Sequence, residues 1–212
     1  MNHPRKNAIV RKQEIMETAL KLFISKGYEK TSTNDIIEEL NLSRGGLYHH
    51  FSSKEEILDT AITTLLRSEK ERVESVISNK KLSAIDKLKI VIGFDSSSQP
   101  MFNNIMALAH TKDNPTLITT LLKKKLEIIT PLFTNIIKQG INEGTFNCKY
   151  PHEVSKISII LSTILFTDTI IQMSIYEYEK MIKTFQMISE LMIGVEPGTF
   201  DFMNQSIHIE NL

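Results

Sequence analysis

A short run in the first quarter of the chain carries side chains suited to contacting a nucleic acid. Arg44, Tyr48 and His49 supply a guanidinium fork, a phenolic hydroxyl and an imidazole close together, and such groups bind base edges and phosphates. Gly45 and Gly46 lie among them, although each glycine costs a helix about 1 kcal/mol relative to alanine. A missing side chain lets a helix backbone approach another surface closely. Taken alone, the run predicts either a recognition helix in a DNA groove or a simple loop, with equal weight.

Capping signals place this run on the second of two short helices. We expect Thr33 to cap the first helix, and Asn41, which tolerates the left-handed conformation, to end it. Ser43 is then placed to cap the second helix. Residues 33–51 therefore have the layout of a helix-turn-helix. Six apolar residues are predicted to pack it against an earlier helix: Ile36, Ile37, Leu40, Leu42, Leu47 and Phe51.

The rest of the chain also has helical periodicity and no convincing strand pattern, which predicts an all-α protein. A capping box at 53–56 opens a long helix that links a small head to a larger helical bundle. Helices are expected at about 9–26, 54–78, 83–93, 115–140 with a kink at Pro131, 151–176 and 179–193, with stops at Gly27 and Gly194. The predicted domains are a DNA-binding head at 1–54, a ligand-binding and dimerisation body at 55–196, and a loose tail at 197–212.

Charge is unevenly distributed along the chain. The formal net charge is zero, so the total charge gives no evidence for a nucleic-acid partner. Residues 1–54, however, hold nine lysines and arginines against six acidic residues. Arg5, Lys6, Arg11 and Lys12 precede the first acidic residue, and such a basic arm suits phosphate contact. A solvated, frayed terminus explains the arm equally well.

Several other classes of protein are disfavoured. Cys148 is the only cysteine and no signal peptide is recognisable, which indicates a reducing, cytoplasmic location. The apolar stretch 157–175 contains Asp168, and a central aspartate costs roughly 3 kcal/mol in a membrane, so we expect a helix buried in protein. His49 and His50 are adjacent and point about 100° apart on a helix, so no metal site is expected. No catalytic or nucleotide-binding motif is present, and we predict no cofactor and no enzymatic activity.

A family resemblance emerges from the motifs taken together. Residues 31–36, the run Leu-Ser-Arg-Gly-Gly-Leu-Tyr-His-His-Phe at 42–51, and Ser-Lys-Glu-Glu-Ile at 53–57 resemble the TetR family of bacterial regulators. The resemblance covers about residues 9–60. It implies a three-helix DNA-binding head on a helical body that dimerises and binds a ligand. Ile37, Asn41 and His49 depart from the residues most frequent in the family, which leaves the operator sequence open.

The resemblance also implies roles for individual residues. Thr33 and Lys54 would contact phosphates, and Arg44 and Gly45 would face base edges. Tyr48, His49 and His50 would contact the DNA backbone or bases. The complete predicted DNA-binding set is Thr33, Ser43, Arg44, Gly45, Gly46, Tyr48, His49, His50 and Lys54.

A ligand pocket is predicted within the body, where apolar and methionine side chains suit an adaptable cavity. Its candidate residues are Phe94, Phe102, Met106, His110, Phe133, Asp168 and Gln172. For each apolar member, ordinary core packing is the simpler interpretation. Asp168 needs a partner because it lies in an apolar helix, and a neighbouring hydroxyl, a second subunit or a ligand would each serve.

The combined prediction is a homodimeric repressor that binds a palindromic DNA operator and is released by a small apolar effector. The expected dimer surface is the apolar helix 154–175 together with the last helix. A helical-bundle adaptor that binds another protein is the alternative. The paired glycines and the Arg/Tyr/His face favour the regulator.

Overall fold

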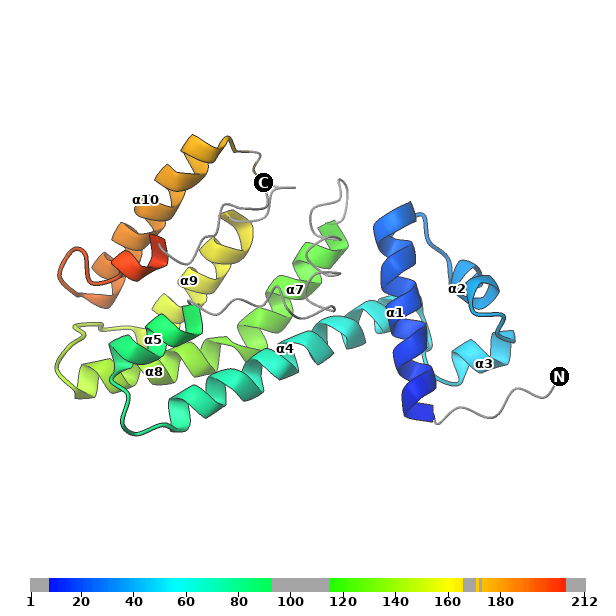
Figure 1. Cartoon of the computed structure of the whole chain (residues 1–212), viewed down its shortest axis with the longest axis horizontal. Helices are drawn as coiled ribbons and strands as arrows, with labels where there is room; N and C mark the ends of the chain where they lie inside the picture. The colour runs from blue at the N-terminus through cyan, green and yellow to red at the C-terminus, as the bar shows by residue number, and fades with distance from the viewer. Residues whose placement is uncertain (1–7, 93–114, 166–170, 172, 205–212) are drawn as a thin grey trace. The chain divides into compact units, whose positions relative to one another are not determined.

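The computed structural model describes residues 8–92, 115–165, 171 and 173–204, and every regular element in these ranges is a helix (Figure 1). None of these helices is long and apolar enough to cross a membrane. The described residues form two compact units. One holds residues 8–65 and 115–121, and the other holds residues 66–92 and the described residues from 122 onward.

The first unit contains the predicted helix-turn-helix. Helix α1 spans Ala8–Lys26, α2 Thr33–Glu39 and α3 Arg44–Tyr48, and α4 (Lys54–Ser78) begins in the same unit. Helix α1 packs on α2, and α2 packs on α3. Ile36, Leu47 and Phe51 are fully buried, whereas the other three predicted core residues are half-buried. The small core therefore forms largely as the apolar pattern predicts.

Two predicted helix starts differ in detail. Ser32, not Thr33, caps α2, and Thr33 is its first helical residue. Ser53 caps α4 as predicted, since its Oγ accepts the Glu56 N–H at 3.2 Å. The Glu56 carboxylate, however, accepts the N–H and hydroxyl of Ser52 at 2.7 and 2.6 Å. The Glu56 carboxylate therefore bonds to Ser52 and not to the N–H of the cap residue Ser53, as a complete capping box would require.

The second unit is built around α8 (Thr130–Asn142), which packs on both α5 (Ala84–Ile92) and α9 (Pro151–Leu165). Helix α10 (Ile175–Ile193) packs on α9 and on a short 3-10 helix, η1 (Asp201–Asn204). Helix α5 begins where the sequence predicts, after Ser83, which forms reciprocal hydrogen bonds with Asp86.

The single helix predicted for residues 115–140 is two helices, and the break between them lies at Ile129, two residues before Pro131, where the sequence predicts a kink. Helix α7 spans Pro115–Ile128 and α8 begins at Thr130. Pro131 has no N–H to continue the ladder. The Ile129 N–H still bonds to the Lys125 carbonyl at 2.8 Å, and the interruption of the hydrogen-bond ladder comes after this bond. Proline in the first turn of a helix is well tolerated, so Pro131 starts α8 instead of bending a longer helix.

The long apolar helix predicted for residues 151–176 is also interrupted, because residues 171, 173 and 174 are not helical. The described part of α9 spans Pro151–Leu165, and α10 starts at Ile175, not near residue 179. Ser174 and Glu177 form a complete capping box at this start. At the other end Gly194 adopts the left-handed conformation, with φ 73°, as its position after the last apolar residue predicts.

The start of the predicted loose tail is in fact packed. Phe200 is 2% exposed, and its N–H donates to the carboxylate of the buried Glu190 at 2.8 Å. Gln186 donates to Asp201 at 2.8 Å. These bonds hold η1 against α10, so residues 197–204 belong to the body.

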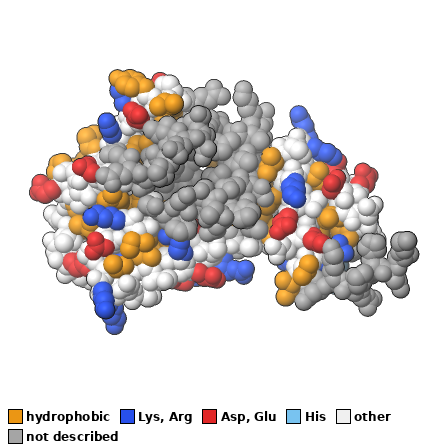
Figure 2. All heavy atoms as spheres, in the orientation of Figure 1, with side chains coloured by type: hydrophobic (Ala, Val, Ile, Leu, Met, Phe, Trp, Pro, Cys, Tyr) orange, Lys and Arg blue, Asp and Glu red, His pale blue; other side chains and the backbone are white. Residues whose placement is uncertain are grey.

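Helices α9 and α10 each expose apolar side chains. On α10, Met187 and Leu191 are 62% and 81% exposed, one helical turn apart. On α9, Ile157 and Ile160 are 44% and 38% exposed. Hydrophobic side chains are visible along α10 in Figure 2. Strongly exposed apolar side chains on two helices that pack together are candidates for an interaction surface, and we call these four residues the α9–α10 face.

Candidate nucleic-acid interface

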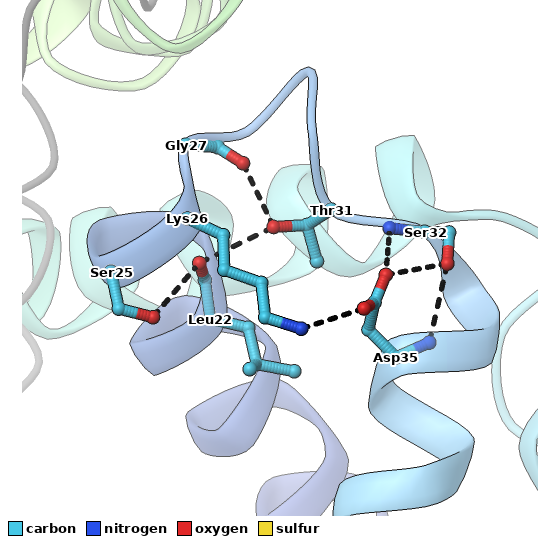
Figure 3. A network of polar contacts seen from close by, with 7 residues as sticks. All are labelled: Leu22, Ser25, Lys26, Gly27, Thr31, Ser32 and Asp35. Carbon is cyan, nitrogen blue, oxygen red and sulfur yellow. Dashed lines mark hydrogen bonds and ion pairs between the residues drawn. The ribbon is translucent and has the colours of Figure 1, made fainter.

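A polar network fixes the start of α2 relative to the end of α1 (Figure 3). The buried Thr31 hydroxyl bonds to the Gly27 carbonyl at 2.8 Å and to the Leu22 carbonyl at 3.3 Å. Gly27 ends α1 in the left-handed region, with φ 90°. The loop between the two helices is therefore tied back onto the last turn of α1.

Asp35 completes this connection. Its carboxylate accepts the Ser32 N–H at 2.7 Å and pairs with Lys26 at 2.6 Å. The Lys26 ammonium, followed by Ser32, holds the pKa of Asp35 well below its ordinary range. The stabilisation from these contacts is therefore complete above the ordinary carboxyl pKa and is lost as the pH falls below it.

Helix α3 follows α2 after a tight turn. Asn41 takes the left-handed conformation with φ 49°, and the Leu42 N–H bonds back to the Ile37 carbonyl at 2.9 Å. Ser43 then caps α3 by accepting the Gly46 N–H at 3.0 Å. Both turn predictions are confirmed, and residues 43–46 are the start of a helix instead of a loop.

The two glycines of α3 differ in their surroundings. A Cβ built on Gly46 would lie 3.2 Å from the Ser43 hydroxyl, so this glycine makes room for the helix cap. A Cβ built on Gly45 would meet no atom within 4 Å, and Gly45 is exposed. Nothing within the described part of the chain requires a glycine at position 45. Its missing side chain leaves space for a molecule outside the protein.

Polar side chains surround the exposed glycine. Arg44 lies over the Tyr48 ring, 5.8 Å from guanidinium carbon to ring centroid, and the Tyr48 hydroxyl lies 3.2 Å from the Thr33 hydroxyl. The bond to Thr33, followed by Arg44, lowers the pKa of Tyr48. We call Thr33, Arg44, Gly45, Tyr48 and His49 the α3 face. All of them except the half-buried Thr33 are exposed.

Further polar groups lie at the end of α3. The rings of His49 and His50 meet edge-on with centroids 5.1 Å apart. Burial, followed by the charges of His49, Lys12 and Arg11, lowers the pKa of His50 and so favours the neutral ring. Lys12 is exposed and lies 5.0 Å from the centroid of the Phe51 ring. From sequence, Lys12 was placed in a basic arm, but it belongs to the first turns of α1.

Lys54 is placed differently from the other predicted DNA contacts. Its ammonium donates to the Tyr28 carbonyl at 2.8 Å and lies 4.4 Å from the Tyr28 ring centroid. It also donates to the Glu29 carbonyl at 3.3 Å. With only 16% of its side chain exposed, Lys54 joins the start of α4 to the loop after α1. The structure therefore favours a stabilising role for Lys54 over a phosphate contact.

Lys54→Ala is expected to destabilise the head by about 1–3 kcal/mol, because it removes charged hydrogen bonds to two carbonyl groups. Urea unfolding followed by circular dichroism measures this change. Lys30→Ala, at an exposed lysine of the same loop, is the matched control and should stay within about 0.5 kcal/mol of wild type. The phosphate contact would be supported instead if the Lys54→Ala protein were fully stable and the slope of its log binding constant against log salt concentration were smaller by about one.

Most of the predicted ligand pocket lies outside the described residues. Of its seven residues only Phe133, on α8, is described. The other six are Phe94, Phe102, Met106, His110, Asp168 and Gln172. Among the described residues, no three His, Cys, Asp or Glu side chains gather where they could hold a metal ion.

Comparison with known families agrees with the geometry of the head. Residues 15–61 match the family model for bacterial regulatory proteins of the tetR family. Residues 103–188 match the model for the tetracyclin repressor-like C-terminal domain. Together the two matches span most of the chain, including the whole helix-turn-helix.

Two curated proteins illustrate the relationship. The chain is 29% identical over 150 residues to YfiR of Bacillus subtilis, an uncharacterised HTH-type transcriptional regulator, and the match covers 66% of this chain and 70% of YfiR. It is 37% identical over 51 residues to IcaR of Staphylococcus aureus (strain Newman), the negative transcriptional regulator of a biofilm operon. The IcaR match covers 24% of this chain and 27% of IcaR.

Solved structures share the fold. One is the complex of SmeT with triclosan, which superposes with a TM-score of 0.65 at 14% identity over 90% of this chain and 94% of SmeT. At this identity the likeness concerns the fold alone.

Proposed function

Because the chain belongs to the TetR family of bacterial transcription regulators, we propose that it is a repressor that binds a palindromic operator as a homodimer and is released by a small molecule. A DNA-binding helix-turn-helix is a property of this family. The repressing action, the dimer, the operator and the effector are our proposal. IcaR, similar in the head, is a negative regulator, which favours repression.

The observation that carries the proposal is the exposed Gly45 on the α3 face. Recognition helices contact base edges with their N-terminal residues, and Arg44 and Gly45 are the first two residues of α3. Arg44 provides the fork that pairs with guanine. Thr33 and Tyr48 flank it with hydroxyls that suit phosphate oxygens. These groups favour DNA over the protein partner of an adaptor.

The α9–α10 face supports a two-fold dimer. A single head makes too few contacts for tight, specific binding, and two heads on successive major grooves need half-sites about 34–36 Å apart. A two-fold interface uses the same surface on both subunits. Met187 and Leu191 are too exposed to contribute to the core of one subunit, so we assign them to contact with a second copy.

Release by a small molecule is supported by the composition of the body and by related folds. The second unit is helical and apolar inside, and SmeT, of similar fold, is solved with triclosan bound. An effector that binds one arrangement of the dimer better than another shifts the population towards it. We expect this shift to move the two heads out of register with the operator.

Operator binding tests the proposal directly, by fluorescence anisotropy on DNA from upstream of the gene. Arg44→Ala is expected to weaken specific binding about tenfold to a hundredfold, equivalent to about 1–3 kcal/mol. Arg67→Ala, at an exposed arginine of α4, is the control and should bind like wild type. Wild-type protein that does not distinguish this DNA from a scrambled sequence contradicts the proposal.

A further inference from the structure

A cavity of about 160 Å³ lies inside the second unit, among α5, α8, α9, α10 and η1. Apolar side chains form most of its wall, among them Phe133 and Ile137 of α8 and Phe185 of α10. An apolar cavity of roughly 150 Å³ in a protein core has room for one benzene ring. The space therefore fits a molecule of about one six-membered ring.

One side of the cavity is polar. Ser155, Ser158 and Ser162 lie three and four residues apart on α9, and Ser189 faces them from α10. Residues with this spacing share one helix face. The cavity thus has a row of hydroxyls along one otherwise apolar wall.

These hydroxyls differ in what they can offer a ligand. Ser162 and Ser189 donate their protons to carbonyls of their own helices, at 3.2 and 2.7 Å, which leaves oxygen lone pairs to accept a bond. Ser158 makes no hydrogen bond within the described residues and is half-buried, so it can donate or accept. The row of serines can therefore both accept a hydrogen bond from a ligand hydroxyl and donate one to it.

The C-terminal segment closes another side. Phe200 and Met203 line the cavity. The bond from the Phe200 N–H to Glu190 and the bond from Gln186 to Asp201 hold this segment in place. The Glu190 carboxylate accepts the Phe200 N–H and the Gln186 amide N–H, and it is not in the cavity wall. None of the described lining residues carries a charge. Among these residues a charged ligand would lose hydration without finding a counter-charge.

We propose that this cavity is the effector site and that it takes a neutral, largely apolar molecule of about one ring bearing a hydroxyl group. The role of the cavity as an effector site rests on the proposed regulatory function, whereas the binding of a ligand in the cavity does not. Helices α9 and α10 carry the cavity on one side and the α9–α10 face on the other. A ligand between these helices alters the surface through which two copies pair.

Calorimetric titration of the full-length wild-type chain with three matched probes tests the chemistry. Benzyl alcohol should bind saturably at one site per chain. Toluene, which lacks the hydroxyl, should bind about fivefold more weakly, the usual effect of one neutral hydrogen bond. Benzoate at pH 7.5 should show no binding, because it is charged. No saturable binding of benzyl alcohol, or equal binding of benzoate, overturns the proposal.

Two variants locate the site. Ser158→Ala should weaken benzyl alcohol about fivefold and leave toluene unchanged, whereas Ser158→Leu should fill the cavity and abolish binding of both. Ser78→Ala, at an exposed serine of α4, is the control and should bind like wild type. If Ser158→Leu fails to fold, the affinities of Ser158→Ala still test whether the probes bind in this cavity. Unchanged affinity for both probes in Ser158→Ala places the binding elsewhere and overturns the assignment.

Operator release is measured separately, so the two proposals can fail independently. Protein that binds benzyl alcohol but never binds operator contradicts the proposed function and leaves the cavity assignment standing. Protein that binds both, with no change in operator affinity at saturating benzyl alcohol, overturns the effector role of the cavity. Weaker operator binding by wild type, but not by Ser158→Leu, supports both proposals.

Discussion

Gly45→Leu is expected to abolish specific operator binding while leaving the protein folded. A leucine at this position would project from the exposed start of α3 and hold the helix away from the floor of the groove. What remains is non-specific attraction to phosphates, which is about a thousandfold or more weaker than specific binding. Anisotropy on the operator and on scrambled DNA measures both affinities.

The fold should tolerate this change because nothing within the protein occupies the space. No atom lies within 4 Å of a Cβ at position 45, and leucine is the better helix former by roughly 0.8 kcal/mol. Thermal unfolding should therefore show an unchanged or slightly raised Tm. Gly46→Leu is the contrasting variant, because its Cβ would crowd the Ser43 cap at 3.2 Å. It should lower the Tm.

Specific binding retained in a folded Gly45→Leu protein would remove the evidence that α3 enters a groove. The recognition element would then have to be sought on another face. A folded variant with normal non-specific affinity and no specific affinity is the expected result. That pattern separates loss of recognition from loss of structure.

Predictions based on backbone conformation were the most successful. Gly27, Asn41 and Gly194 were each predicted to end a helix, and all three adopt positive φ. Few residues tolerate that conformation, so the residue type alone carries the information. The Ser43 cap is a local signal of the same kind, since its bond to Gly46 joins atoms three residues apart.

Two errors came from giving more weight to apolar periodicity than to local polar signals. The apolar run at 157–175 suggested one long helix and hid Ser174 and Glu177, which have the spacing of a capping box. Pro131 was assigned to a kink, although proline in a first turn also starts a helix. Both signals were present in the sequence. Each of them favours a helix start over continuation of the preceding helix.

Other features depend on contacts that no local pattern contains. Lys54 bonds to carbonyls that lie 25 and 26 residues earlier in the chain. Because these contacts are not visible in the local sequence, a lysine at this position suggested a cation available for phosphate. The serines of α9 have visible helical spacing, but the cavity that they face needs α8, α10 and η1 to exist. Ile164, in the apolar helix that the sequence predicts as part of the dimer surface, is only half-buried. The structure instead identifies Leu191.

Leu191→Glu is expected to convert a wild-type dimer into a folded monomer that no longer binds operator tightly. Leu191 is 81% exposed, so a glutamate there is hydrated in the separate subunit and should leave its helical circular dichroism unchanged. In a two-fold interface on the α9–α10 face, the substitution would bury an unpaired carboxylate in both subunits. Each buried charge costs several kcal/mol after relaxation, enough to dissociate a typical dimer at micromolar concentration.

Light scattering measures the mass of each protein, and operator anisotropy measures the consequence for DNA binding. Ser75→Glu, which adds the same charge at an exposed site of α4, should remain dimeric and bind operator. Because two linked heads bind far more tightly than one, the Leu191→Glu monomer should lose most of the specific affinity while keeping an intact α3 face. Wild-type protein that is monomeric both free and on DNA contradicts the dimer. A Leu191→Glu protein that stays dimeric shows that pairing uses another surface.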